Sequence, residues 1–452
     1  MTTALDSPYF RDQFCTPSMR TVFADKARIS AWLRVEVALA RAQADLGLIP
    51  AEAADEIARV ARIEALDLAA MKADYDLSGV AIVPLVKHLG ALCSPQARRW
   101  LHWGATTQDI LDTGFVLQIR DALALIGADL DTTIRATAAL ALRHRDTVMA
   151  GRSFQQQAVP ITFGYKVAVW LDELLRHRER LDALKQRVLV GQFGGAVGTL
   201  APLDDTGLAV RAALMRILDL KDPAITWHTA RDRWAELVHW LAMLGATLGK
   251  IGTEVAALMR SEVNELREPF VEGRGGSSTM PQKRNPVTSL QIIAIARRLR
   301  DLPGGQLDAM IQDHERGTGA MPLEWLVVPE AFLLLSGALA QVAPLLQGLE
   351  VDAERMRANL DTGAGLLMAE AVMTGLGPAL GRADAHAIVS AAARRASAGD
   401  MTLRAALLED ARVTDHLSPQ ALDQLLEPAN YIGSAGAMVD RVLDLARAKG
   451  LA

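Results

Sequence analysis

A polar segment in the second half of the chain combines side chains that could transfer a proton. Residues 272–289 read EGRGGSSTMPQKRNPVTS and place Ser277, Lys283 and Asn285 close together. A serine hydroxyl could act as a nucleophile or a base, a lysine supplies a cation, and an asparagine amide binds an oxygen. Glycines allow the segment to move, and long loops inside compact domains are often functional. The alternative is a solvated, flexible connection between two helices.

The flanking sequence predicts long helices that would hold this segment. Proline, which breaks helix interiors, is absent between Pro95 and Pro160 and between Pro223 and Pro269. Apolar residues in the second interval recur in steps of three and four, which predicts a helix with one buried face. These residues are Trp234, Leu237, Leu241, Leu244, Leu248, Ile251, Val255 and Leu258. Similar spacing predicts long helices through residues 116–130 and 171–188.

A second stripe on the predicted helix consists of small residues. They are Ala235, Ala242, Gly245, Gly249, Gly252 and Ala256. Glycine inside a helix costs about 1 kcal/mol relative to alanine, so we expect another helix backbone to approach here. Shorter capped helices are predicted at 352–360, 381–398 and 418–426, and no strand pattern of convincing length is recognisable. The pattern predicts an all-α chain with helical domains at 1–109, 110–350 and 351–452, the second being a long-helix bundle.

Composition narrows the possible functions. The chain has 452 residues, of which 50% are hydrophobic and 5% aromatic, and its net charge is −5. Mild acidity argues against a nucleic-acid partner, which usually requires a basic surplus. Two cysteines, Cys15 and Cys93, cannot form a disulfide framework, and the histidines lack metal-ligand spacing. Neither a signal peptide nor an apolar run of about 18 residues is visible, so we expect a cytoplasmic protein without a membrane span.

Three segments resemble one enzyme superfamily. GSSTMPQKRNP, residues 276–286, is similar to the signature loop of the fumarase/aspartase superfamily, GSSxMPxKxNP, at every fixed position. HWGATTQDILDTG at 102–114 and GRSFQQQAVPITFG at 151–164 resemble two further stretches of that superfamily. The resemblance implies a three-domain, all-helical subunit and a homotetramer whose active sites combine segments from different subunits. It also implies that neither a metal nor an organic cofactor is used.

The resemblance also implies a reaction. In this superfamily a base removes a proton next to a carboxylate, which gives an aci-carboxylate dianion, and a group then leaves the β carbon. Ser277 matches the base, Lys283 and Asn285 match residues that hold the carboxylate whose charge grows, and Ser278 would contact substrate. A serine is a poor base in water, so it needs nearby donors, a cation and a dry site.

Further substrate-binding positions follow from the resemblance: His102, Thr106, Thr107, Gln108, Gln156, Gln157 and Arg316. Residues 106–108 match positions that grip a substrate carboxylate, but they could instead cap a helix beginning near Asp109. Arg316 could clamp a second carboxylate or form a surface ion pair. Gln156 and Gln157 could bind a carboxylate or lactone oxygen. Arg231 and Arg233 are predicted to be structural, at the start of the long helix.

Two positions separate branches of the superfamily. Phe154 and Gln157 stand where other branches carry the histidine acid that helps the leaving group depart. A carboxylate leaving group is already a stable anion and needs no such acid. The branch that expels a carboxylate comprises the bacterial 3-carboxy-cis,cis-muconate cycloisomerases, which interconvert a small tricarboxylate and its lactone in aromatic (protocatechuate) degradation through the β-ketoadipate pathway. Looser matches to that branch occur at 82–90, 192–201, 227–233, 314–325 and 425–433, although the branch often has histidine where Gln157 stands.

Other functions remain open at this point. An adenylosuccinate lyase would carry a His-Asp-Val stretch where this chain has Gly79-Val80-Ala81, and an arginine where it has Trp325. Another C–N lyase releasing fumarate is a second alternative. A catalytically inactive structural relative is a third, and the intact Ser277, Lys283 and Asn285 argue against it.

Overall fold

The computed structural model describes residues 3–269, 272–273, 275–276, 279–280, 282–399 and 401–452. The chain forms two compact units, each assembled from three stretches of sequence. The first unit comprises Met1–Asp129, His177–Ala246 and Ala294–Ala340, and the second comprises Leu130–Arg176, Thr247–Ile293 and Gln341–Ala452. The division into domains at 1–109, 110–350 and 351–452 remains a prediction.

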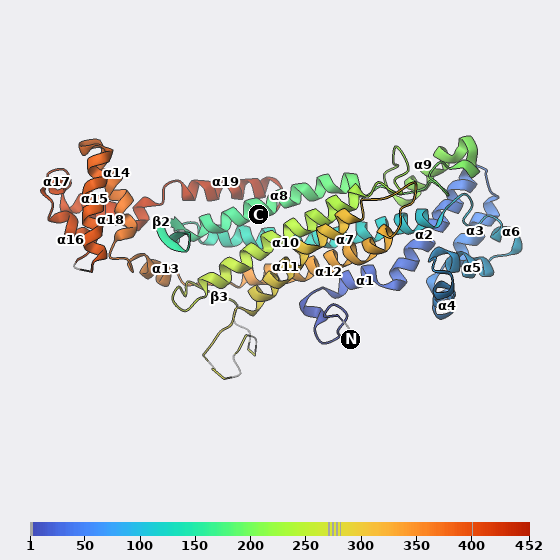
Figure 1. Cartoon of the computed structure of the whole chain (residues 1–452), viewed down its shortest axis with the longest axis horizontal. Helices are drawn as coiled ribbons and strands as arrows, with labels where there is room; N and C mark the ends of the chain where they lie inside the picture. Colours follow the sequence, from blue (N-terminus) through green and yellow to red (C-terminus); the bar gives the residue numbers. More distant parts are fainter. Residues whose placement is uncertain (1–2, 270–271, 274, 277–278, 281, 400) are drawn as a thin grey trace. The chain divides into compact units, whose positions relative to one another are not determined.

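Five long helices contribute residues to both units, and they confirm the all-α fold (Figure 1). They are α7 (Thr107–Arg143), α8 (Phe163–Val188), α10 (Asp232–Leu258), α11 (Val287–Asp308) and α12 (Ala320–Gln347). Every member of the predicted apolar stripe on α10, from Trp234 to Leu258, is at most 2% exposed. The predicted apolar positions of α7 and α8 are buried as well.

The small residues of α10 allow α11 to approach closely. A Cβ atom on Gly245 would lie 2.5 Å from the Cδ1 atom of Leu299. One on Gly252 would lie 3.2 Å from the carbonyl oxygen of Ser289. The predicted close approach of another helix backbone is therefore confirmed at Gly252, whereas at Gly245 the close neighbour is a side chain of α11.

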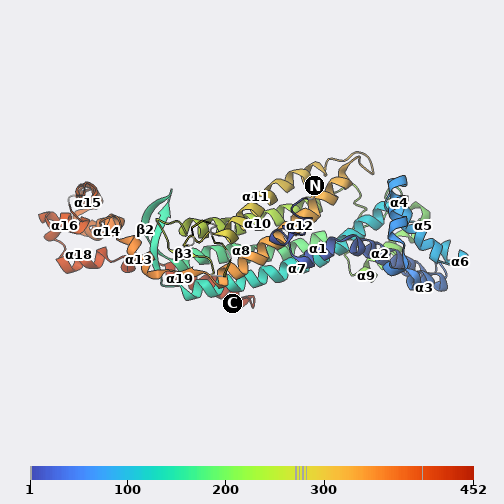
Figure 2. The same ribbon diagram turned by 90° about the horizontal axis from the view of Figure 1, so that it is seen from below.

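The first unit adds short helices at the N-terminal end of the chain, shown in blue in Figures 1 and 2. They are η1 (Arg11–Gln13), α1 (Pro17–Phe23), α2 (Asp25–Asp45), α3 (Ala51–Val60), η2 (Ile63–Ala65), α4 (Leu68–Ser78), α5 (Ile82–Leu92) and α6 (Pro95–Arg98), followed later by η3 (Ala201–Thr206) and α9 (Gly207–Leu218). Polar caps fix several of these ends: the Asp67 carboxylate accepts from two backbone amides of α4, and Ser94 caps α6.

The second unit contains the remaining short elements. They are β1 (Val148–Ser153), β2 (Gln156–Thr162), β3 (Leu266–Arg267), β4 (Glu350–Val351), α13 (Ala353–Leu360), η4 (Leu366–Met368), α14 (Ala369–Leu380), α15 (Arg382–Ser397), α16 (Leu403–Leu408), α17 (Ala411–Thr414), α18 (Pro419–Leu426), η5 (Pro428–Tyr431) and α19 (Ala435–Ala448). The three predicted C-terminal helices are confirmed as α13, α15 and α18. Asp352 and Ser418 cap the first and the last of them through side-chain oxygens.

The expectation of no recognisable strand is wrong for residues 148–162. Strands β1 and β2 pair antiparallel, with Val148 opposite Thr162 and Ser153 opposite Gln156. The register shifts between Ala150 and Arg152, at Gly151, where a Cβ atom would lie 2.7 Å from the Val159 carbonyl oxygen. Such a bulge interrupts the alternation by which a strand is recognised in a sequence.

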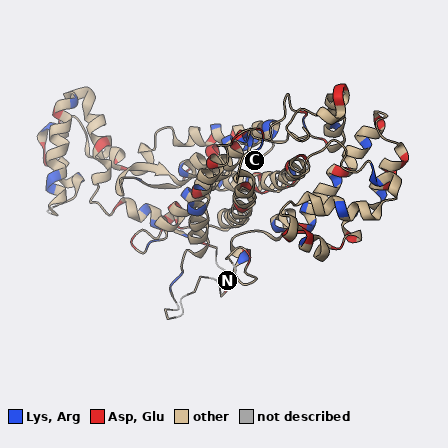
Figure 3. Ribbon diagram, turned by 45° about the vertical axis from the view of Figure 1, so that its right-hand side comes forward, with Lys and Arg blue, Asp and Glu red and all other residues tan. Residues whose placement is uncertain are grey.

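Basic and acidic residues are interspersed over the chain (Figure 3), in keeping with the small net charge. Among the described residues, α10 and α12 are long and apolar enough to span a membrane by length and composition alone. Of their most apolar windows, 56% and 72% respectively are buried inside the protein. A core helix of a helical bundle is also long, apolar and largely buried. The length and composition of α10 and α12 are therefore only weak evidence for a membrane span.

Candidate active site

Asp109, in the first turn of α7, gathers four donors around one buried carboxylate. Its Oδ1 atom accepts from the amide of Gly194 at 2.9 Å and from Nε2 of His228 at 2.8 Å. Its Oδ2 atom accepts from the amides of Gly195 at 2.9 Å and Thr106 at 3.0 Å. The glycine-rich turn after α8 thus holds the start of α7, and Gly195 has a φ of +72° that favours glycine.

Gln108 lies beside this carboxylate and uses its whole amide. Its Nε2 atom donates to Oδ2 of Asp112 at 3.1 Å and to the carbonyl oxygen of His228 at 2.8 Å. Its Oε1 atom accepts from Nε of Arg316 at 2.9 Å. Gln108 is only 3% exposed, whereas Arg316 is exposed. The structure therefore brings Gln108 and Arg316, two predicted site residues, into contact. Of the two, only Arg316 is accessible to solvent or a ligand.

Arg231 is a buried structural residue immediately before α10, as the sequence predicts. Its guanidinium binds both carboxylate oxygens of Asp112, at 2.8 and 2.9 Å, and both oxygens of Glu324, at 2.9 and 2.5 Å. Gln306 donates to Glu324 at 3.1 Å. Burial raises the pKa of Glu324, although the hydrogen bonds and the charge of Arg231 lower it. This network stabilises the surroundings of Gln108.

His102 pairs with a carboxylate that the sequence analysis missed. Its Nδ1 atom lies 2.6 Å from Oε1 of Glu36, a residue of α2 that is 1% exposed. Burial alone would lower the pKa of His102, but the charge and hydrogen bond of Glu36, with a contribution from Asp109, outweigh it and raise the pKa. A lone glutamate between apolar residues of α2 was the available signal for a buried partner.

We expect substrate binding to weaken as pH rises through the raised pKa of His102. If His102 binds substrate as predicted, its imidazolium would attract a carboxylate, and this cation persists above the ordinary pKa of 6.5 before it is lost. Glu36→Gln removes the main stabilising charge, so the rise in KM should move to lower pH. KM and kcat measured from about pH 6 to 9 test this. A KM that stays flat in both proteins would contradict a role for His102 in binding.

The ends of the signature loop are anchored in the second unit. The backbone amide of Asn285 and its Nδ2 atom both donate to the carbonyl oxygen of Gly275, at 3.0 and 3.1 Å. Arg284 binds both carboxylate oxygens of Glu350 and the backbone carbonyl oxygen of Glu268. Lys283 is exposed. Ser277 and Ser278 lie outside the described residues.

A buried carboxylate fixes the helix that follows the loop. Glu268, 6% exposed, accepts from the amides of Thr288 and Ser289 at 3.0 and 2.7 Å, and from the Ser289 hydroxyl at 2.7 Å. These amides belong to the first turn of α11, where donors lack partners within the helix. Glu268 thereby holds the start of α11 directly after the segment that carries Lys283 and Asn285.

The hairpin of β1 and β2 presents the predicted glutamines. Gln156 and Gln157 are exposed, and Nε2 of Gln157 donates to the carbonyl oxygen of Asn359 at 2.9 Å. Phe154 lies in the hairpin turn with a φ of +50° and is 99% exposed. Behind the turn, Arg152 binds both oxygens of Glu265, at 2.9 and 2.6 Å. The hairpin is thus tied down at its base, while its tip carries an apolar ring into solvent.

The predicted site residues thus form two groups. His102, Thr106, Thr107, Gln108 and Arg316 belong to the first unit, and Gln156, Gln157, Lys283 and Asn285 belong to the second. Within the described part of the chain, no three His, Cys, Asp or Glu side chains are placed to hold a metal ion. Each group presents polar side chains suited to carboxylates.

Comparison with known proteins identifies the protein family to which this chain belongs. Residues 11–300 match a protein family described as Lyase, and residues 365–442 match one described as Adenylosuccinate lyase C-terminus. The chain therefore belongs to the lyase family of the fumarase/aspartase superfamily.

Individual relatives differ in the reaction that their names state. A 3-carboxy-cis,cis-muconate cycloisomerase of Pseudomonas aeruginosa is 47% identical, over 96% of this chain and 95% of its own. Trans-aconitate decarboxylase 1 of Mycosarcoma maydis is 43% identical, over 96% of this chain and 88% of its own. Among solved structures, the 3-carboxy-cis,cis-muconate lactonizing enzyme of Pseudomonas putida has a TM-score of 0.91 at 42% identity, covering 96% of this chain and 98% of that one. These similarities support an enzyme of the lyase superfamily.

Proposed function

We propose that this enzyme interconverts 3-carboxy-cis,cis-muconate and 4-carboxymuconolactone, a step of protocatechuate degradation. The similarity to the Pseudomonas aeruginosa cycloisomerase along nearly the whole chain carries the proposal. Phe154 and Gln157 agree with it, because neither side chain can protonate a leaving group near neutral pH. The reaction forms or breaks a bond to a carboxylate oxygen, which leaves as a stable anion.

Each predicted residue has a role in this reaction. In lactone opening, Ser277 removes the proton next to a carboxylate, the electron pair passes into that carboxylate, and the lactone C–O bond breaks from the β carbon. Lys283 and Asn285 stabilise the dianion that develops. His102, Thr106, Thr107, Arg316, Gln156, Gln157 and Ser278 would bind the substrate. Gln108 is buried with its amide fully engaged, so it acts by orienting Arg316 rather than by touching the substrate.

The proposal is tested by incubating purified protein with 3-carboxy-cis,cis-muconate and following loss of the diene absorbance. Trans-aconitate, followed by release of CO₂, tests a second candidate function, which the Mycosarcoma maydis relative favours. We expect no turnover of adenylosuccinate, because Trp325 and the stretch from Gly79 to Ala81 lack the groups of that branch. Turnover of trans-aconitate or adenylosuccinate without turnover of carboxymuconate would contradict the proposal.

We further propose a cytoplasmic homotetramer in which segments of different subunits complete each active site. One feature supports this assembly: Phe154 exposes an apolar ring at the hairpin tip.

We expect sedimentation at micromolar concentration to give about four times the 48.7 kDa of one chain. Phe154→Asp should weaken association because it places a charge at the proposed contact. The matched control is Tyr9→Asp, at another exposed aromatic residue. An active protein that sediments as a single chain would contradict the shared-site arrangement.

A further inference from the structure

Gln157 is held by a closed ring of polar contacts within the second unit. Its Nε2 atom donates to the backbone carbonyl oxygen of Asn359 at 2.9 Å, and Nδ2 of Asn359 donates to Oε1 of Glu265 at 2.8 Å. Glu265 in turn accepts two bonds from the guanidinium of Arg152, at 2.9 and 2.6 Å. Arg152 lies opposite Gln157 in the register of the β1–β2 hairpin, which closes the ring.

The ring joins three segments that are far apart in the sequence: the hairpin, the segment just before β3, and helix α13. Glu265 is 0% exposed and Asn359 is 3% exposed. Nδ2 of Asn359 also donates to the carbonyl oxygen of Val263 at 2.8 Å, which fixes the amide because a carbonyl oxygen can only accept. A buried carboxylate needs such partners, so Glu265 favours one arrangement of the hairpin and α13 over others.

The ring also fixes which way the Gln157 amide faces. Its Nε2 atom makes a second, longer contact of 3.4 Å with Oγ1 of Thr362, whose hydroxyl donates to the carbonyl oxygen of Asn359 at 2.8 Å. Both acceptors lie on the Nε2 side, so the carboxamide oxygen is turned away from them. A direct bond to a carboxylate or lactone oxygen would need the N–H groups that Asn359 and Thr362 already occupy. The exposed Gln157 side chain therefore meets a ligand as an acceptor, for example of a water molecule that bridges to a carboxylate.

The turn of the hairpin adopts a conformation that its own residues disfavour. Phe154 and Gln155 have φ values of +50° and +65°. Two consecutive positive φ values suit Asn-Gly or Gly-Gly rather than phenylalanine and glutamine. Such conformations persist only where the surrounding contacts impose them, and they cluster at functional sites. The bonds of Arg152 and Gln157 supply contacts of this kind on both strands next to the turn.

We propose that Glu265 is a positioning residue for substrate binding. Through Asn359 and Arg152 it holds Gln157 in the orientation that presents the carboxamide oxygen to the ligand. Glu265 itself touches no substrate, because its carboxylate is enclosed and bound by Arg152 and Asn359. The inference rests on the proposed function in one respect, namely that Gln157 contacts a small carboxylate substrate.

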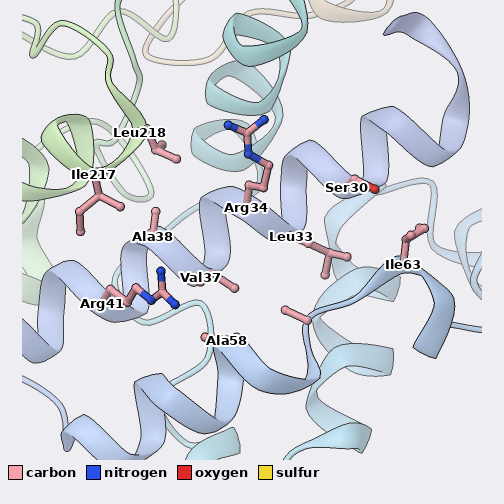
Figure 4. Close-up of a pocket in the computed structure, with 11 residues that line it drawn as sticks. Ser30, Leu33, Arg34, Val37, Ala38, Arg41, Ala58, Ile63, Ile217 and Leu218 are labelled. Atoms are coloured by element: carbon pink, nitrogen blue, oxygen red, sulfur yellow. The ribbon is translucent and has the colours of Figure 1, made fainter. Parts of the chain in front are cut away.

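A cavity of about 380 Å³ beside α2 in the first unit gives no comparable indication of a ligand. Its arginines, Arg34 and Arg41, project in different directions (Figure 4), so they do not converge on one anion. None of the described residues that line it contributes a buried polar atom without a partner. The ring around Glu265 is therefore the better supported feature.

Calorimetric titration of the full-length protein with propane-1,2,3-tricarboxylate, an unreactive tricarboxylate, tests the proposal through a double-mutant cycle. We expect Gln157→Leu and Glu265→Gln each to weaken binding about fivefold, as the loss of one hydrogen bond allows. The doubly substituted protein should bind no more weakly than Gln157→Leu alone, because Glu265 acts through Gln157. A merely structural role of Glu265 would make the two losses multiply to about 25-fold, and that result would overturn the proposal.

Arg355→Met is the matched control. Arg355 ties α13 to the same segment, through the carbonyl oxygens of Val263 at 3.2 Å and Glu262 at 3.1 Å, but it lies outside the ring, so its loss should leave the affinity unchanged. Thermal melts establish that each variant is folded, and Asn359→Ala replaces Glu265→Gln in the cycle if that variant is not. Failure of the unchanged protein to bind the tricarboxylate would overturn the proposal. Absence of carboxymuconate turnover together with the expected cycle would contradict the proposed reaction alone.

Discussion

Ser277→Ala should slow the chemical step at least about a hundredfold, the low end for losing a general acid or base. The hydroxyl is the proposed base, and alanine has no group that can accept a proton. Folding should change little, within about 0.5 kcal/mol, because the loop ends are held by contacts that do not involve this side chain. Those contacts are the bonds of Asn285 to Gly275 and of Arg284 to Glu350. The measurement is kcat with a parallel thermal melt.

Two further variants show whether the effect is specific. Ser278→Ala is the matched control, since the neighbouring serine is proposed only to contact substrate, and its kcat should remain close to normal. Lys283→Met should reduce the rate as strongly as Ser277→Ala but for another reason, because it removes the cation facing the developing dianion. Normal kcat in Ser277→Ala with loss in Ser278→Ala would reverse the two assignments. Normal kcat in both would contradict the proposed mechanism.

The long helices were predictable because their burial repeats regularly. On α10, steps of three and four place the eight apolar residues of the predicted stripe, from Trp234 to Leu258, on one face, and tertiary contacts bury all eight. The glycines at 245 and 252 were interpretable for a similar reason, since glycine in a helix interior is costly unless another chain segment comes close. In these segments the residues that favour a helix are also the residues that tertiary packing buries, so the sequence alone predicts both the helix and its buried face.

The buried carboxylates were not predictable in this way. Glu265 and Glu268 look like ordinary surface residues of their segments, and Glu36 stands out only as a lone glutamate between apolar residues. Each of the three is buried only because a distant partner reaches it. His102, Arg152 and the first turn of α11 are those partners. Burial of a charge is tolerable only with such partners, and sequence spacing does not reveal which segments meet. The β1–β2 hairpin was missed because its bulge at Gly151 breaks the alternating pattern.

Arg231→Met should destabilise the protein by about 3–5 kcal/mol, the usual cost of removing one partner from a buried ion pair. The guanidinium is 2% exposed and neutralises two carboxylates, Asp112 and Glu324, which are 3% and 1% exposed. Methionine fills much of the same volume but leaves both carboxylates without their cation. The measurement is the free energy of unfolding from denaturant titration. The matched control is Arg233→Met, half-buried at the same helix start, for which we expect a much smaller loss.

The pH dependence distinguishes lost charge compensation from lost packing. Burial already raises the pKa of Glu324, and removing Arg231 takes away the groups that lower it, so the pKa should rise further. A carboxyl whose folded pKa is raised stabilises the fold below its unfolded pKa, and that contribution is lost as pH rises through the folded pKa. The loss in Arg231→Met should therefore be larger at about pH 8 than at pH 5.

Adding Glu324→Gln to Arg231→Met should recover part of the stability at pH 8, because it removes one uncompensated charge. A loss that is equal at both pH values and unaffected by Glu324→Gln would mean that Arg231 acts by packing between Trp227 and Trp234, whose ring centroids lie 5.0 and 5.7 Å from its guanidinium carbon.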